Sequence, residues 1–314
     1  MKQKNINYLP LSWQYTSNYS NPVEQKLTTS HQLWLTTGKI DLFNFQGLIN
    51  SVKCEEGNSS FIIRGCNKKL TEKLTQESFD HIIFGKEAVL SFSENHFGKK
   101  SLRDLIKRGM KKGKVVEVER SDEVIQLLWK LIINSRHGKE PQLKHLFITE
   151  FVDETRLFVF VNPGNEWLGA ILVSINSPEK FHTELLLKHN NAPIGIMEAL
   201  IFAAFKILKN SEKKELSLGE VPFYADIPIT KSFYRDFILN RIAKFFRFAY
   251  NYKGLYDFKN KFNPRWDDVY ICGYPRLKLS HIVGIIFRSN LLQLIKYKLL
   301  HKKKLRDFKN PGVL

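Results

Sequence analysis

The clearest pattern of apolar and polar positions lies in residues 188–222, KHNNAPIGIMEALIFAAFKILKNSEKKELSLGEVP. A polar turn, NNAPIG, precedes an almost wholly apolar run from Ile196 to Leu208, which predicts a buried helix with Asn191 as its cap. Glu215 to Leu218 then predicts a short strand. Because the first-turn N–H groups of a helix point outward at its positive end, the loop before Ile196 predicts a site for anionic or carbonyl oxygen atoms.

The pattern upstream extends this stretch into a domain. Residues 122–135 have the spacing of an amphipathic helix, residues 157–161 and 167–173 predict a hairpin around the turn NPGNE, and residues 182–187 predict a third strand. The order helix, strand, strand, strand, helix, strand is typical of an acyltransferase-type α/β domain. It predicts a mixed sheet, with a helix crossing after the central strand.

The first 95 or so residues predict a smaller α/β or β-rich unit. Strands are expected at residues 43–49, 60–64, 81–85 and 88–92. A short helix is expected at residues 70–76. A further helix with a dense aromatic face is expected at residues 236–250.

A strongly basic helix is predicted between these two parts. Leu102, Leu105, Ile106 and Met110 form a narrow apolar stripe at helical spacing, and the only acid nearby is Asp104. The other positions are mainly basic: Lys99, Lys100, Arg103, Lys107, Arg108, Lys111 and Lys112. With so little compensating acid, we favour contact with phosphates over a merely solvated face.

The composition is that of a globular protein with an anionic partner. Lys and Arg number 49 against 31 Asp and Glu, a formal net charge of +18, and 43% of the residues are hydrophobic. This balance indicates nucleic acid or an anionic membrane surface as the partner. The three cysteines have no metal-ligand spacing, which suits a reducing, cytoplasmic compartment. Neither a signal peptide nor an apolar run of about 18 residues is visible, so no transmembrane segment is expected.

Two C-terminal stretches add basic character. Residues 252–270 interleave Lys259, Lys261 and Arg265 with aromatics such as Tyr270, which suits phosphate contact with base stacking, or else an aromatic core with a basic rim. Residues 277–314 carry an apolar face followed by a lysine-rich end. Such a tail either lies on an anionic leaflet or docks on the protein.

Several motifs, in this order, resemble one known family. They are Gly98-Lys99-Lys100, residues 191–198 (NAPIGIME), residues 218–222 (LGEVP) and residues 254–270 (GLYDFKNKFNPRWDDVY). Together they resemble the cytosolic catalytic region of bacterial phosphatidylglycerol lysyltransferases, the multiple peptide resistance factors. The resemblance runs from about Phe84 to Pro275, and Lys188-His189-Asn190 stands where the family has Arg-Tyr-Asp.

The resemblance implies an α/β (α+β) architecture of tandem GNAT-like acyltransferase folds with mixed sheets, linked by the basic helix. The corresponding domains are a short N-terminal one (1–97), the linker helix (98–114), the catalytic domain (115–275) and the basic tail (276–314). It also implies an aminoacyl-tRNA donor, a phospholipid acceptor such as phosphatidylglycerol, and an enzyme peripheral to the inner leaflet. Since the Gly-rich coenzyme A loop of ordinary acetyltransferases is missing, no cofactor is expected.

An activated ester needs a positioned nucleophile, a stabilised oxyanion and a proton acceptor. We expect loop N–H groups from Asn191 to Gly195 to stabilise the oxyanion, and Glu198 or Glu220 to bind the amino group or accept a proton. The expected substrate contacts are Lys188, Asn190, Lys259, Lys261, Arg265 and Tyr270. The expected tRNA contacts are the seven basic side chains of the linker helix. An acyltransferase using acyl-CoA or an acyl carrier, and a non-enzymatic binder of RNA or membrane, remain as alternatives.

Overall fold

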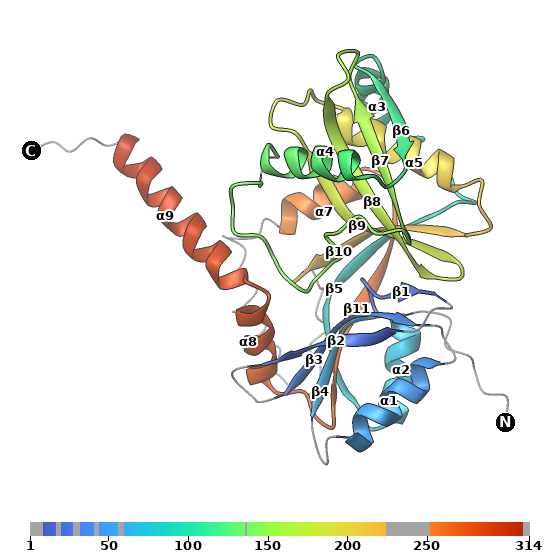
Figure 1. The fold of residues 1–314 in the computed structure, drawn as a ribbon, viewed down its shortest axis with the longest axis vertical. Coiled ribbons are helices and arrows are strands. Elements are labelled where there is room, and N and C mark those ends of the chain that lie inside the picture. Colours follow the sequence, from blue (N-terminus) through green and yellow to red (C-terminus); the bar gives the residue numbers. More distant parts are fainter. Residues whose placement is uncertain are drawn as a thin grey trace, which may run out of the picture.

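The computed structural model describes residues 9–16, 20–27, 32–40, 44–55, 60–135, 137–223 and 252–309. The described strands form one mixed sheet of eleven strands, in the order β1-β3-β4-β11-β5-β10-β9-β8-β7-β6, with β2 paired to β3 off this path. The sheet runs through both halves of the molecule (Figure 1). Its strands are β1 (Gln14–Tyr15), β2 (Ser20–Lys26), β3 (Leu33–Ile40), β4 (Phe61–Cys66), β5 (Asp80–Ser91), β6 (Lys114–Val118), β7 (Thr155–Val161), β8 (Trp167–Ser177), β9 (Lys180–Lys188), β10 (Glu215–Pro222) and β11 (Arg265–Tyr274).

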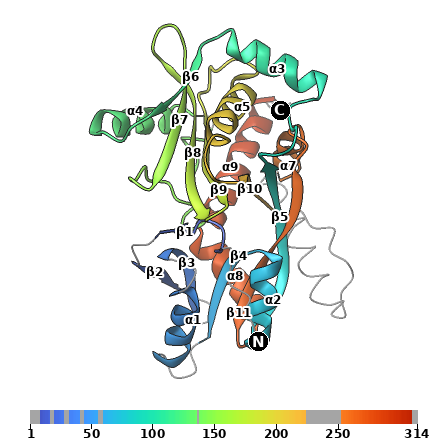
Figure 2. The ribbon, with the colours of Figure 1, turned by 90° about the vertical axis from the view of Figure 1, so that its right-hand side faces the viewer.

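Helices cover both faces of each half of the sheet. They are α1 (Asn44–Glu55), α2 (Lys68–Gln76), α3 (Lys100–Met110), α4 (Asp122–Ile133), α5 (Ile196–Leu208), α7 (Tyr252–Asn260), α8 (Leu279–Arg288) and α9 (Leu291–Lys309). In the C-terminal half, α3, α5 and α7 lie on one face and α4 on the other (Figures 1 and 2). In the N-terminal half, α1 and α2 cover one face and α8 the other.

The predicted C-terminal domain is confirmed in its element order. The helix α4 is followed by the antiparallel strands β7, β8 and β9, and the buried helix α5 then leads to β10, which pairs parallel with β9. The bounds of α5 match the apolar run. Its cap, however, is Gly195, in the left-handed region at φ 96°, and not Asn191.

The start of α5 touches α3 through backbone. A Cβ on Gly195 would lie 2.3 Å from the carbonyl oxygen of Leu105, and one on Gly109 would lie 2.3 Å from the carbonyl oxygen of Gly195. Glycine at both positions therefore permits a close approach that no other residue allows. The apolar stripe of α3 is used for this contact, since Leu102 and Ile106 are buried, and its basic side chains are left at the surface.

The N-terminal half departs from expectation at residues 43–49. A strand was predicted there, but residues 44–55 form helix α1. The prediction is wrong because Phe45, Leu48, Ile49 and Val52 recur at helical spacing and are all buried on one face. The two strands predicted at 81–85 and 88–92 are one strand, β5. The helix predicted at 236–250 lies outside the described residues.

The strand β11 changes the expected domain boundaries. Although it follows the C-terminal domain in the sequence, it lies between β4 and β5 and pairs antiparallel with both. Residues 265–274, expected in a catalytic domain of residues 115–275, thus complete the sheet of the N-terminal half.

The tail is docked over its first part. Ile282, Ile285 and Ile286 of α8, with Leu291 and Ile295 of α9, are buried against the N-terminal sheet. Beyond this contact α9 projects from the body of the protein (Figure 1), and the side chains of Leu299 and Leu300 are exposed. No helix in the described ranges is both long and apolar enough to cross a bilayer.

Candidate active site at the divergence of two parallel strands

The strands β9 and β10 pair only at their beginnings. Glu215, Leu216 and Ser217 lie opposite Lys180, Phe181 and His182. The register of β10 against β5 then shifts between Ser217 and Glu220. Gly219 lies within this shift at φ 85°, a conformation that glycine adopts without strain. The two strands therefore separate after Ser217. In open α/β sheets, ligands bind in the crevice where neighbouring parallel strands separate, so the gap between β9 and β10 is a candidate ligand site.

Buried ionisable side chains from five elements meet at this divergence. They are Arg64 of β4, Glu87 of β5, Lys180 and His182 of β9, Glu220 of β10 and Lys259 of α7. Lys180 Nζ donates to both carboxylate oxygens of Glu87 at 3.0 and 3.1 Å. Lys259 Nζ donates to the backbone carbonyl oxygen of Glu220 at 2.9 Å. Arg64 Nη2 donates to Glu220 Oε2 and so ties the N-terminal half to the cluster.

One acceptor in this cluster is unused. Within the described part of the chain, Glu220 Oε1 is buried and has no hydrogen-bond partner. The side chain as a whole is only 7% exposed. A buried carboxylate oxygen without a donor is costly, so it is a candidate to receive a proton or a substrate N–H group.

Burial shifts the pKa values of three groups here. It lowers the pKa of Lys259 to about 7, although the carboxylates of Glu220 and Glu87 act in the opposite direction. It also raises the pKa of Glu220, against the opposing charges of Arg64 and Lys259. The pKa of His182 falls well below its usual value through burial and the nearby Lys180, Lys259 and Arg64 charges. His182 is therefore neutral at pH 7, with Nδ1 3.1 Å from Ser217 Oγ.

The structure does not bring the residues predicted for catalysis together. Glu220 lies in the cluster, whereas Glu198 lies in the first turn of α5, where Lys261 Nζ donates to its carboxylate at 2.9 Å. The N–H of Asn191 donates to His189 Nδ1, and the N–H of Ala192 donates to the carbonyl oxygen of His189. These loop N–H groups are thus satisfied within the loop, and Gly195 is packed on α3. Two of the expected oxyanion donors, the N–H groups of Asn191 and Ala192, are therefore already engaged within the loop.

The residues predicted for substrate contact are dispersed as well. Lys259 was expected at a phosphate-binding surface but is only 3% exposed, because α7 packs against β10. Arg265 is held by the carboxylates of Asp267 and Glu215, which raise its pKa. Tyr270 is buried in the N-terminal half, with its ring 5.8 Å from that of His81. Lys259, Arg265 and Tyr270 thus do not lie together on one exposed phosphate-binding surface.

Three other predicted residues lie on the surface or near it. Lys188 is partly exposed at the end of β9, and Asn190 is exposed, with its N–H bound to the carbonyl oxygen of Asn134. Lys261 is 41% exposed.

The seven predicted basic side chains of α3 and its ends are all exposed. Among the residues that the structure describes, none of these seven forms an ion pair. They are Lys99, Lys100, Arg103, Lys107, Arg108, Lys111 and Lys112.

Sequence reasoning missed most of the cluster. Glu87 and Lys180 each occur in a segment whose sequence predicts a strand. The neighbouring residues do not show that both strands lie in the middle of the sheet. One signal in the sequence could have indicated the cluster. Lys180, His182 and Glu184 occupy alternate positions of one strand, and alternate positions lie on the same face of a sheet. No group of three or more His, Cys, Asp and Glu side chains in the described ranges is arranged to hold a metal ion.

A parallel strand pair that diverges beside a crossing helix, next to a second α/β half, gives this protein a GNAT-like architecture. Residues 44–273 match the family model described as phosphatidylglycerol lysyltransferase, C-terminal, and the chain belongs to this family. No curated protein matched the sequence.

Solved structures support the same fold. The structure of L-PGS from Bacillus licheniformis matches with a TM-score of 0.68 and 17% identity, over 85% of this chain and 84% of that chain. The C-terminal domain of a putative lysylphosphatidylglycerol synthetase from Agrobacterium fabrum matches with a TM-score of 0.66 and 15% identity, over 87% and 84%. The crystal structure of FemX matches with a TM-score of 0.51 and 10% identity, over 81% and 83%. The expected fold class is therefore confirmed.

Proposed function

We propose that the protein transfers an aminoacyl group from aminoacyl-tRNA to a hydroxyl group of a membrane phospholipid such as phosphatidylglycerol. The observation that carries the proposal is the buried cluster at the β9–β10 divergence, with a lysine whose pKa is about 7 beside an unpartnered carboxylate oxygen. Family membership supports the reaction class, and the exposed basic helix supports the donor.

Three members of the cluster, Lys259, Glu220 and Arg64, have roles in this chemistry. The acceptor hydroxyl oxygen attacks the ester carbonyl carbon while neutral Lys259 takes the hydroxyl proton. When the bond to the ribose oxygen breaks, Lys259 returns this proton to the leaving oxygen. Glu220 Oε1 accepts a hydrogen bond from the amino group of the aminoacyl moiety. Arg64 holds the other oxygen of Glu220, which fixes the direction of Oε1.

The acceptor side is proposed to lie at the inner leaflet of the cell membrane. The exposed Leu299 and Leu300 on the projecting part of α9 suit contact with an anionic lipid surface. The docked part of the tail, by contrast, belongs to the protein core. Removal of the whole tail would therefore uncover the N-terminal sheet, and a truncation that tests membrane contact should begin after Ile295.

The transfer itself is tested with purified protein, total charged tRNA carrying labelled amino acids, and phosphatidylglycerol vesicles. We expect labelled lipid to accumulate with at least one amino acid, and none to form with tRNA that has been deacylated. If no amino acid is transferred and the protein binds acyl-CoA instead, the proposal is wrong. Testing all amino acids together avoids a false negative, because Lys188-His189-Asn190 differs from the motif of the family.

The donor contact predicts a specific dependence on salt. Replacement of Lys107 and Lys111 by Gln should reduce the slope of log affinity for tRNA against log salt concentration by about 2, since each lost phosphate contact removes roughly one released ion. Filter binding between 50 and 200 mM salt measures the slope.

The matched control replaces two exposed lysines at the start of α2, in the N-terminal half, by Gln: Lys68 and Lys69. This variant has the same net charge as the α3 variant. Equal slopes for the two variants would show that only net charge matters and that α3 is not the contact.

A further inference from the structure

A surface groove of about 510 Å³ lies at one end of the C-terminal sheet. It is bounded by the second half of α4, the turn between β7 and β8, and residues 189–193, the loop from which the oxyanion donors were expected. Its volume is within the range of small-molecule sites. Because three separate elements build its walls, the groove is a feature of the folded domain and not of one loop.

The side chains that line the groove have the chemistry of a nucleotide site. Trp167 and His189 provide aromatic rings, Asn134 and Asn191 provide amide groups, and Lys130 provides a positive charge. Aromatic rings stack on bases, amides bind base edges, and lysines bind phosphates. Since His189 Nδ1 accepts a hydrogen bond from the N–H of Asn191, the neutral ring carries its hydrogen on Nε2, which is a further donor.

The groove continues the basic surface of α3. Lys112, two residues beyond the end of α3, is one of its lining residues. Lys112 and Lys130 are the lysines among the lining residues, and Glu166 is the one acid among them. The Glu166 carboxylate accepts a hydrogen bond from Asn162 at 2.8 Å and retains further acceptor capacity for a ribose hydroxyl.

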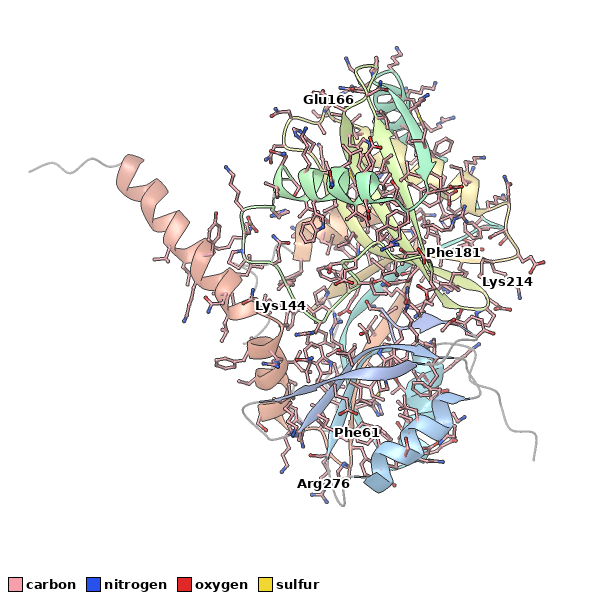
Figure 3. All side chains as sticks on the ribbon, viewed as in Figure 1. Phe61, Lys144, Glu166, Phe181, Lys214 and Arg276 are labelled. Carbon is pink, nitrogen blue, oxygen red and sulfur yellow. The ribbon has the colours of Figure 1, made fainter. Side chains whose placement is uncertain are left out.

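The groove is separate from the ionisable cluster. His189 follows His182 by seven residues along and just beyond β9, a separation of roughly 23 Å at the rise of a β-strand. In Figure 3, Glu166 of the groove lies at the far end of the C-terminal half, whereas Phe181, next to His182, lies where the two halves meet. A nucleotide in the groove is thus not the one whose ester reacts at Lys259.

We propose that this groove binds a nucleotide of the acyl donor, with its base stacked on Trp167 and its phosphate near Lys130 and Lys112. The identity of the donor rests on the proposed function, under which the nucleotide belongs to the single-stranded end of an RNA. Coenzyme A also contains a nucleotide that is distant from its reactive group, so the experiment includes both ligands.

The test measures binding of a fluorescently labelled single-stranded RNA ending in CCA, and of coenzyme A, to the full chain. Trp167→Ala should weaken RNA binding about 10- to 100-fold, the effect of losing one stacked base. Asn191→Ala, a change at an exposed side chain that leaves the fold intact, should weaken it by up to about tenfold. The matched control is Trp129→Ala, because Trp129 is a 58% exposed tryptophan of α4 that does not line the groove.

If Trp167→Ala and Asn191→Ala both bind RNA as tightly as the unmodified protein, the proposal is wrong, even if aminoacyl transfer is observed. Binding of coenzyme A but not RNA, lost in Trp167→Ala, would support a nucleotide site and reject the tRNA donor. Equal losses of RNA affinity in Trp167→Ala and Trp129→Ala would also overturn the proposal. They would show that RNA binds no more tightly at the groove than at another exposed tryptophan.

Discussion

Replacement of Lys259 by Met is expected to reduce kcat/KM for aminoacyl transfer by about 10²- to 10⁴-fold, the usual contribution of a general base. The side chain is buried beside Glu220, and its pKa of about 7 leaves a large neutral fraction at physiological pH. In the unmodified protein, kcat/KM should therefore rise with pH through about 7 and level off above it.

The pH profile separates proton transfer from a purely structural role. The Met variant should lose the rise near pH 7, and Lys259→Arg, which stays charged, should not restore activity. Lys209→Met, an exposed lysine at the end of α5, is the matched control and should keep both rate and profile. If the Met variant keeps a full rise near pH 7, Lys259 is not the base.

The same group affects stability with a defined sign. Its pKa in the folded protein, about 7, lies below the ordinary value of 10.5. Between these values the unfolded chain binds more protons, so the free energy of unfolding rises with pH across this window. The Met variant should lack that rise in urea unfolding measured at pH 7 and 9.

Replacement of Glu87 by Ala is expected to lower the free energy of unfolding by about 3–5 kcal/mol, because it leaves the Lys180 charge buried without its partner. Both side chains of this pair are less than 5% exposed. Urea unfolding at pH 7 measures the loss.

The double variant Glu87→Met and Lys180→Met is the control that identifies the cause. It removes both charges and fills a similar volume, so it should recover most of the stability that Glu87→Ala loses. A double variant as unstable as the single one would mean that the loss arises from packing and not from the unpaired charge.

The sequence predicted the elements whose pattern is local. The apolar run from Ile196 to Leu208 and the striped basic helix that became α3 were correct because a period of 3.6 residues is visible within a few turns. Residues 43–49 were misjudged because a short apolar stretch fits either a strand or one face of a helix. In the same way, β11 has an ordinary strand pattern, and only tertiary structure inserts it between β4 and β5.

The candidate site was less predictable for a related reason. Glu220 could be named from its motif, but its partners come from β4, β5, β9 and α7, which are distant in the chain. The burial of Lys259 depends on where α7 packs, and a lysine among aromatic residues resembles a surface position when read locally. Asn191 was placed at the reactive ester, whereas the structure places it in the groove at the opposite end of β9.

The insertion of β11 has a consequence for synthesis of the protein. Until residues 265–274 leave the ribosome, β4 and β5 lack the neighbour that each pairs with in the finished sheet. Their facing edges are open to other chains during this interval, and such edges promote aggregation. Most of the C-terminal half is translated earlier and can form β6 to β9 meanwhile. The N-terminal half, although made first, is therefore completed last, and it cannot be produced as an independent fragment by cutting the gene at the linker helix.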